Sequence, residues 1–136
     1  MTLVDRFRGL ADPTRLRIMN LLMAGELCGC DIQYVLGLSQ PNVSRHLSYL
    51  RRSGLVQDAR RGFRVYYRLN GVQDAEHDAL FTYLTEAFRQ DRLFRHDQRK
   101  LRAAIRDGAC TVSERPVAPI DGARATRRLK GGRRIR

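Results

Sequence analysis

The chain of 136 residues lacks the features typical of membrane proteins, secreted proteins and enzymes. It has no run of about 18 apolar residues that could span a bilayer. Its first residues, MTLVDRFRGL, lack the long apolar core of a signal peptide. It also lacks a CxxC motif, a phosphate-binding loop and a pair of carboxylates. We therefore predict a cytoplasmic protein with no membrane partner and no catalytic residues; a thiol-dependent enzyme is the least favoured alternative.

Cysteine is scarce, with only Cys28, Cys30 and Cys110 in the chain. An odd number of thiols in a reducing compartment fits a disulfide scaffold poorly. Two of the three stand one residue apart in ELCGCD (26–31), where a helix is predicted to begin. Such a pair can be two small buried hydrophobic residues. It can also be two ligands for a soft metal, because a helix N-terminus lowers the pKa of a thiol.

Acidic residues are outnumbered, with 14 Asp and Glu against 26 Lys and Arg, a net charge of +12. This excess predicts attraction to polyanions. Residues 111–136 hold eight Lys or Arg and two Asp or Glu, together with prolines and glycines and no apolar period. We predict a folded domain over residues 1–106 and a basic, disordered tail over residues 107–136.

Apolar spacing predicts four helices in the first part of this domain, near residues 3–10, 13–24, 28–36 and 40–53. Leu3, Phe7 and Leu10 lie on one face of the first helix. The second carries apolar residues around most of its circumference, so it should be central and buried. The fourth begins at a Ser-Gln-Pro cap signal and has a narrow apolar face.

The apolar period then changes from 3.6 to 2. Phe63, Val65, Tyr67 and Leu69 alternate with charged or polar residues, and a weaker strand covers residues 55–60. We predict a β-hairpin with Arg61-Gly62 as its turn. A long helical pattern resumes after Gly71 and continues to Ile105.

Two short helices joined by a Gly-containing turn and followed by a basic hairpin are typical of a winged helix-turn-helix. We therefore predict an α+β, mainly α fold with a two-stranded β-hairpin wing. Between Ser39 and Arg68 there are seven arginines and one acidic residue, Asp58. Such arginines can be plain surface charges, but in this pattern they favour contact with double-stranded DNA. The predicted contact residues are Pro41, Asn42, Arg45, Ser48, Tyr49, Arg52, Arg60, Arg61 and Arg64.

Four stretches in this order resemble the ArsR/SmtB family of metal-sensing repressors: LADPTRLRIMNLL (10–22), ELCGCD (26–31), LSQPNVSRHLSYLRRSGLV (38–56) and GFRVYYRLN (62–70). The resemblance implies a homodimer, built on the first and last helices, that blocks transcription when metal-free. It also implies that Gln40, Pro41, Ser44 and Arg45 approach DNA bases.

Within that family, ELC-x-CD resembles the arsenic and antimony sensors. As(III) or Sb(III) is then the expected inducer, with no organic cofactor; Cd(II), Zn(II) and thiol oxidation remain alternatives. Those sensors carry a third cysteine where this chain has Gln33. Cys110 of either subunit, or a small cellular thiol, is left to complete a three-sulfur site. The family's zinc site on the last helix is expected to be absent, because Asp74 and His77 have the wrong spacing and His96 lies too far along. We predict that both histidines are surface residues.

The thiol pair leads to a mechanism. In a regular helix, residues i and i+2 point about 200° apart, so Cys28 and Cys30 inside a helix cannot face one atom. We expect a bound metalloid to distort the first helical turn, which Gly29 makes easier. This distortion would reach the DNA-reading helix through residues 37–39.

Overall fold

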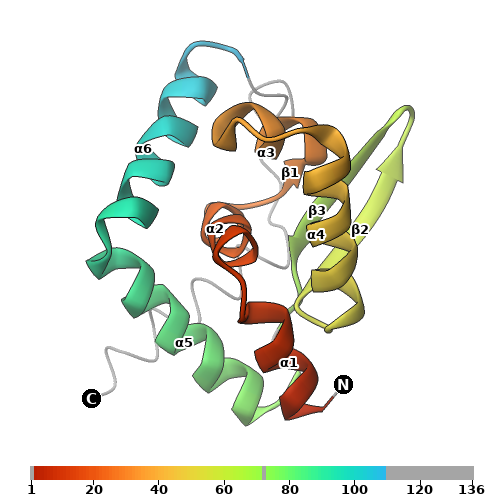
Figure 1. The fold of residues 1–136 in the computed structure, drawn as a ribbon, viewed down its shortest axis with the longest axis vertical. Helices are drawn as coiled ribbons and strands as arrows, with labels where there is room; N and C mark the ends of the chain where they lie inside the picture. The colour runs from red at the N-terminus through yellow and green to blue at the C-terminus, as the bar shows by residue number, and fades with distance from the viewer. Residues whose placement is uncertain (1, 72, 110–136) are drawn as a thin grey trace.

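The computed structural model describes residues 2–71 and 73–109. Cys110 and residues 111–136 of the predicted tail lie outside the described residues. The described part is mainly helical with a small antiparallel sheet, as predicted (Figure 1). Its elements are α1 (Leu3–Leu10), α2 (Pro13–Leu22), β1 (Leu27–Cys28), α3 (Gly29–Leu36), α4 (Gln40–Arg52), β2 (Val56–Arg61), β3 (Arg64–Leu69), α5 (Ala75–Gln90) and α6 (Arg92–Arg106). Within this part, no helix is long and apolar enough to cross a bilayer.

Helix α2 occupies the centre of the molecule, between α6 on one side and the wing on the other (Figure 1). It begins where the sequence predicts, because the Asp12 carboxylate accepts from the Arg15 backbone N–H at 3.0 Å and Pro13 fits the first helical position. Ile18 and Leu22 are fully buried among the other core side chains. The prediction of a central buried helix is confirmed.

The sheet has three strands in the order β1-β3-β2, one more than the predicted hairpin. Leu27 pairs with Tyr67 and Cys28 with Tyr66, so β1 lies along the outer edge of β3. A strand of two residues is too short to produce a period-2 pattern in the sequence. The strand that leads into α3 therefore belongs to the same sheet as the wing.

The predicted turn of the wing is displaced by one residue. Arg61 pairs with Arg64, so the turn falls on Gly62-Phe63 and not on Arg61-Gly62. Gly62 has a φ of 64°, which residues with a side chain resist. As a result, Phe63 is fully exposed at the tip and does not belong to the apolar face predicted for it, while Tyr66 is buried.

The long last helix is two helices, α5 and α6, that meet at Asp91. Asp91 has extended backbone angles, φ −100° and ψ 132°, and its carboxylate accepts from the Leu93 backbone N–H at 2.9 Å, which caps α6. The chain bends here, and α6 continues past α2, against which it packs (Figure 1).

Polar contacts fix α6 to α2. The Arg17 guanidinium donates to both oxygens of Asp97, at 2.8 and 3.0 Å, and the Asp97 side chain is fully buried. This hydrogen bond is the main reason that the pKa of Arg17 is raised. Asn20 donates to the Phe94 carbonyl at 2.9 Å and accepts, through its own carbonyl, from Gln98 at 2.6 Å. The two helices are thus joined at three points.

The prediction of two surface histidines is half right. His96 is exposed, but His77 is completely buried, with its ring 4.2 Å from that of Phe81. His77 lies one turn before Phe81, so both side chains point to the same side of α5. Burial is the main cause that lowers the pKa of His77 below its ordinary value.

Helix α1 presents most of its apolar residues outward. Leu3, Val4 and Phe7 are each more than half exposed, whereas Arg6 is buried and pairs with Asp74 at 3.3 Å. Gly9 lies on the inward side, so close to Ser53 and Leu55 that a Cβ there would meet their side chains at 2.7–2.9 Å. Hence α1 is seated on the domain by Arg6, Gly9 and the buried Leu10, and the apolar side chains of Leu3, Val4 and Phe7 remain open.

Candidate functional site

The outer face of α4 carries most of the predicted DNA contacts. Its inner face buries Val43, Leu47 and Leu50 in the core, which orients the opposite face to solvent. On the rest of the helix Gln40, Pro41, Ser44, Arg45 and Arg52 are exposed, and Asn42, Ser48 and Tyr49 are half-buried.

The two sides of this face have different surroundings. The Arg51 guanidinium lies 3.9 Å from the Asp58 carboxylate of β2. The side of α4 that carries Arg51 therefore faces the wing. Ser44 lies seven residues before Arg51 and therefore on the same side. On the other side, the guanidinium carbon of Arg15 lies 4.1 Å from the ring centroid of Tyr49, and that of Arg52 lies 5.7 Å away. Tyr49 is thus brought together with α2 and not with the wing.

The wing carries Arg60, Arg61 and Arg64 at its exposed end. Arg61 is engaged within the chain, because its guanidinium donates to both carboxylate oxygens of Glu26, at 2.6 and 3.0 Å. This hydrogen bond is the main cause that raises the pKa of Arg61. The Glu26 side chain is nearly buried, so it holds Arg61 beside the thiol segment. Glu26 was missed in the sequence because nothing local connects residues 26 and 61.

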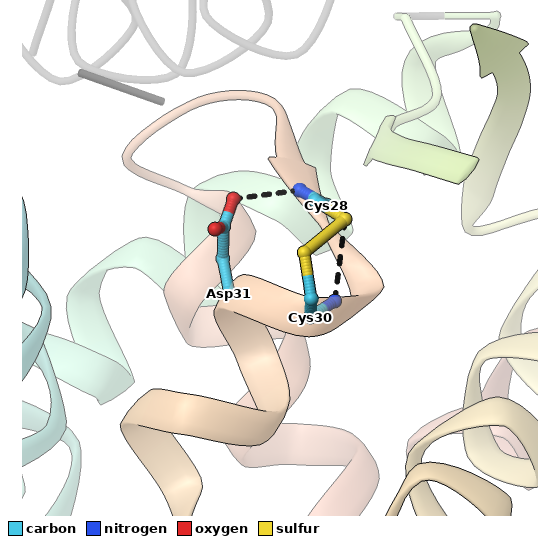
Figure 2. Close-up of a disulfide and its surroundings, with 3 residues drawn as sticks. All are labelled: Cys28, Cys30 and Asp31. Atoms are coloured by element: carbon cyan, nitrogen blue, oxygen red, sulfur yellow. Dashed lines mark hydrogen bonds between the residues drawn. A yellow bond between two sulfur atoms is a disulfide. The ribbon is translucent and has the colours of Figure 1, made fainter. Parts of the chain in front are cut away.

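Cys28 and Cys30 lie at the junction of β1 and α3 and are joined by a disulfide (Figure 2). Cys28 is the N-cap of α3, with φ −71° and ψ 151°, and its sulfur accepts from the Cys30 backbone N–H at 3.3 Å. The Asp31 carboxylate accepts in return from the Cys28 N–H at 2.9 Å. The Cys28 side chain is buried and Cys30 is exposed, so an attacking group reaches the pair through Cys30.

This geometry overturns two expectations. The two sulfurs do not point apart, because Cys28 precedes the helix and has an extended backbone. Both can therefore face one atom without distortion of the first turn. Nor does the odd number of cysteines prevent a disulfide, since this one is a local link across two residues and not a staple between distant segments.

A complete metal site is not assembled by the described residues alone. Within residues 2–71 and 73–109, no group of three or more His, Cys, Asp or Glu side chains could hold an ion. Cys28 and Cys30 supply two soft sulfur donors, which suit thiophilic ions such as As(III) and Sb(III) once reduced. A third donor has to come from elsewhere.

The sequence matches one protein-family model and several known proteins. Residues 12–58 match the family model described as "Bacterial regulatory protein, arsR family". The chain is 47% identical over 83 residues to the arsenic resistance transcriptional regulator ArsR1 of Pseudomonas putida, covering 60% of this chain and 64% of the relative. It is 52% identical over 68 residues to the arsenical resistance operon repressor of Escherichia coli, covering 49% and 58%. The chain thus spans about 60% of the length of these relatives.

Solved structures of similar fold include two regulators. Reduced HlyU from Vibrio cholerae is 32% identical, with a TM-score of 0.55, over 64% of this chain and 88% of that one. The homodimeric winged helix-turn-helix DNA-binding domain of Mb0332 from Mycobacterium bovis is 29% identical, with a TM-score of 0.54, over 62% and 76%. The likeness to Mb0332 agrees with the winged helix-turn-helix architecture derived above.

Proposed function

Because the chain belongs to the ArsR family of bacterial regulatory proteins, we propose that it is a transcriptional repressor that binds operator DNA as a homodimer. In this proposal, As(III) or Sb(III) binds the thiolates of Cys28 and Cys30 and causes the protein to release the operator DNA. The adjacency of two cysteine sulfurs at the start of α3 carries the proposal. The arsenical resistance regulators among its relatives support this choice of inducer. The named relatives are regulators, which disfavours the thiol-dependent enzyme.

The disulfide has to be reduced before the pair binds an ion. A cellular dithiol supplies two electrons and two protons, is itself oxidised, and leaves two cysteine thiols. The N-terminus of α3 and the Cys30 N–H then favour the thiolate form of Cys28, because both place positive charge beside its sulfur. Exposed Cys30 gives the inducer its first sulfur.

Cys110 is our candidate for the third sulfur. The described chain ends at residue 109, immediately before it. Helix α6, which leads to this position, packs against α3. A small cellular thiol or Cys110 of a second subunit is the alternative donor. In each case the sulfurs of Cys28 and Cys30 are the fixed part of the site.

We propose that the signal reaches DNA through the wing. Cys28 belongs to β1, which is hydrogen-bonded to β3, and the neighbouring Glu26 holds Arg61. A change in the backbone at Cys28 therefore moves the edge of the sheet that carries the wing. The route through residues 37–39 to α4, which the sequence favours, runs in parallel and needs no unwinding of α3.

A second candidate function is a thiol-oxidation switch on the same fold. It is favoured by the bond between Cys28 and Cys30 and by the likeness to a regulator studied in a reduced form. In this version the disulfide and the dithiol are the two signalling states, and no metalloid is required. The two versions predict different responses to arsenite and to an oxidant.

For DNA recognition, we expect Arg45→Ala to cost about 1–3 kcal/mol on the operator and little on a scrambled duplex, because Arg45 is proposed to contact a base edge. Arg60→Ala should weaken binding to both duplexes alike. It should also lower the slope of log affinity against log salt concentration by about one per half-site, as expected for loss of a phosphate contact. Fluorescence anisotropy at several salt concentrations measures both effects. Arg106→Ala, which removes an exposed arginine at the end of α6, is the control for loss of charge alone. Equal losses on the two duplexes for Arg45→Ala would contradict its role.

For the dimer, we expect Phe7→Asp to produce a monomer. Leu3, Val4 and Phe7 of α1 and Tyr83 of α5 are exposed apolar side chains of the kind that a second subunit covers. A buried carboxylate in that interface is strongly unfavourable. Sedimentation velocity at micromolar concentration gives the mass. Phe63→Asp is the matched control, since Phe63 is also an exposed phenylalanine but lies at the wing tip. Unchanged sedimentation of Phe7→Asp would place the interface elsewhere.

A further inference from the structure

A cavity of about 460 Å³ opens between α2, α5 and α6, away from the thiols and from the wing. Its apolar lining includes Met23, Phe88 and Phe94, and the rings of the two phenylalanines lie 4.6 Å apart. The volume lies within the usual range of small-molecule sites. The bonds of Asn20 to Phe94 and Gln98 hold the two sides together, so the cavity is already formed without a ligand.

Four arginines surround this apolar lining: Arg89 from the end of α5 and Arg95, Arg99 and Arg102 from α6. The last three are spaced at i, i+4 and i+7, so they lie along one face of α6. Like charges at this spacing destabilise a helix. Among the residues that the structure describes, none forms an ion pair or hydrogen bond with these four side chains.

Three other arginines of the described chain are held by carboxylates. Arg6 pairs with Asp74, Arg17 with Asp97 and Arg61 with Glu26. The chain beyond the described residues is a poor source of the missing anion, because residues 111–136 carry a net charge of +6. A separate anionic molecule therefore complements the cavity better than the protein's own chain does.

We propose that this cavity binds a small organic anion, with an aromatic or aliphatic body against Met23, Phe88 and Phe94 and an acidic group among the arginines. The apolar lining distinguishes it from a DNA contact, which needs positive charge but no apolar floor. Helices α5 and α6, which line the cavity together with the end of α2, lie across α2 from α4 and the wing (Figure 1). Because α2 packs on both α6 and α4, such a ligand would act on α4, the proposed DNA-reading helix, through α2.

Anilinonaphthalene sulfonate is a suitable probe, since it combines an aromatic body with one negative charge and fluoresces strongly on transfer to an apolar site. The full chain at physiological salt should bind one probe per subunit, with a saturable and blue-shifted increase in fluorescence. Decanoate should displace the probe, and decanol, its uncharged counterpart, should displace it at least about tenfold less well, as expected for loss of a charge-assisted contact. Equal displacement by the two would overturn the proposal.

The variants test which arginines are involved. Arg99→Glu/Arg102→Glu should weaken probe binding at least about tenfold. Lys100→Glu/Arg106→Glu makes the same change in charge on the same helix outside the cavity lining and should change it less than twofold. Thermal melts followed by circular dichroism test whether both double variants fold. If Arg99→Glu/Arg102→Glu does not fold, Arg99→Gln/Arg102→Gln replaces it. Equal losses in both double variants, or no loss in either, would show that the cavity does not recognise the anion.

Discussion

The Cys28→Ser/Cys30→Ser variant is expected to bind operator DNA about as tightly as the wild-type protein and to remain bound when arsenite is added. The wild-type protein should lose about 5–150-fold in operator affinity, which is the usual range of allosteric coupling. Serine is a good N-cap, so Cys28→Ser keeps the acceptor for the first turn of α3 while removing the soft donor. Fluorescence anisotropy in the presence of a phosphine reductant, with and without arsenite, measures the difference.

Single variants and an oxidant refine this result. Cys28→Ser and Cys30→Ser should each abolish release of DNA, because one sulfur of this pair is not enough. Cys110→Ser should weaken release only if that thiol is the third ligand. If the double variant still releases DNA with arsenite, the proposed sensing site is wrong. If the wild-type protein ignores arsenite but releases DNA on treatment with a thiol oxidant, the oxidation switch replaces the metalloid sensor.

Replacing Asp97 by alanine is expected to lower the free energy of unfolding by about 2–4 kcal/mol. Removal of one partner from a buried ion pair typically costs about 3–5 kcal/mol, and the 23% exposure of the Arg17 side chain reduces this cost. The variant should also loosen α6, since Asp97 is one of its three polar attachments to α2. Urea denaturation followed by circular dichroism measures the change.

Asp107→Ala is the control for this prediction. Asp107 lies 3.8 Å from Arg106, but both side chains are largely exposed, so the pair should contribute less than about 1 kcal/mol. An equally small effect of Asp97→Ala would mean that apolar packing alone holds α6 on α2.

The elements that could be predicted from the sequence are those with strong local signals. Helix α2 has a cap, a proline and a dense apolar pattern, and α4 has a cap and a regular inner face. The break at Asp91 also has a signal. The step from Phe88 to Phe94 is six residues, which does not fit the 3.6-residue period that joins the other inner positions.

The thiol site was harder to predict because its geometry depends on pairing between distant residues. Cys28 precedes α3 as its N-cap and also pairs with Tyr66 in the sheet, and no local pattern encodes this second contact. The same holds for Glu26 and Arg61, which are 35 residues apart. The residue types and their spacing indicated soft-metal chemistry, whereas the direction of the two sulfurs required the structure.

The pairing of β1 with β3 also determines when the thiol site can form during synthesis. Leu27 pairs with Tyr67, so about forty residues, including all of α3, α4 and β2, have to be made before β1 has its partner. Closing a loop of that length costs chain entropy that only the completed sheet repays. A nascent chain therefore contains α4 before its cysteines acquire their native backbone. The proposed DNA-reading and sensing parts become complete together, when the wing closes.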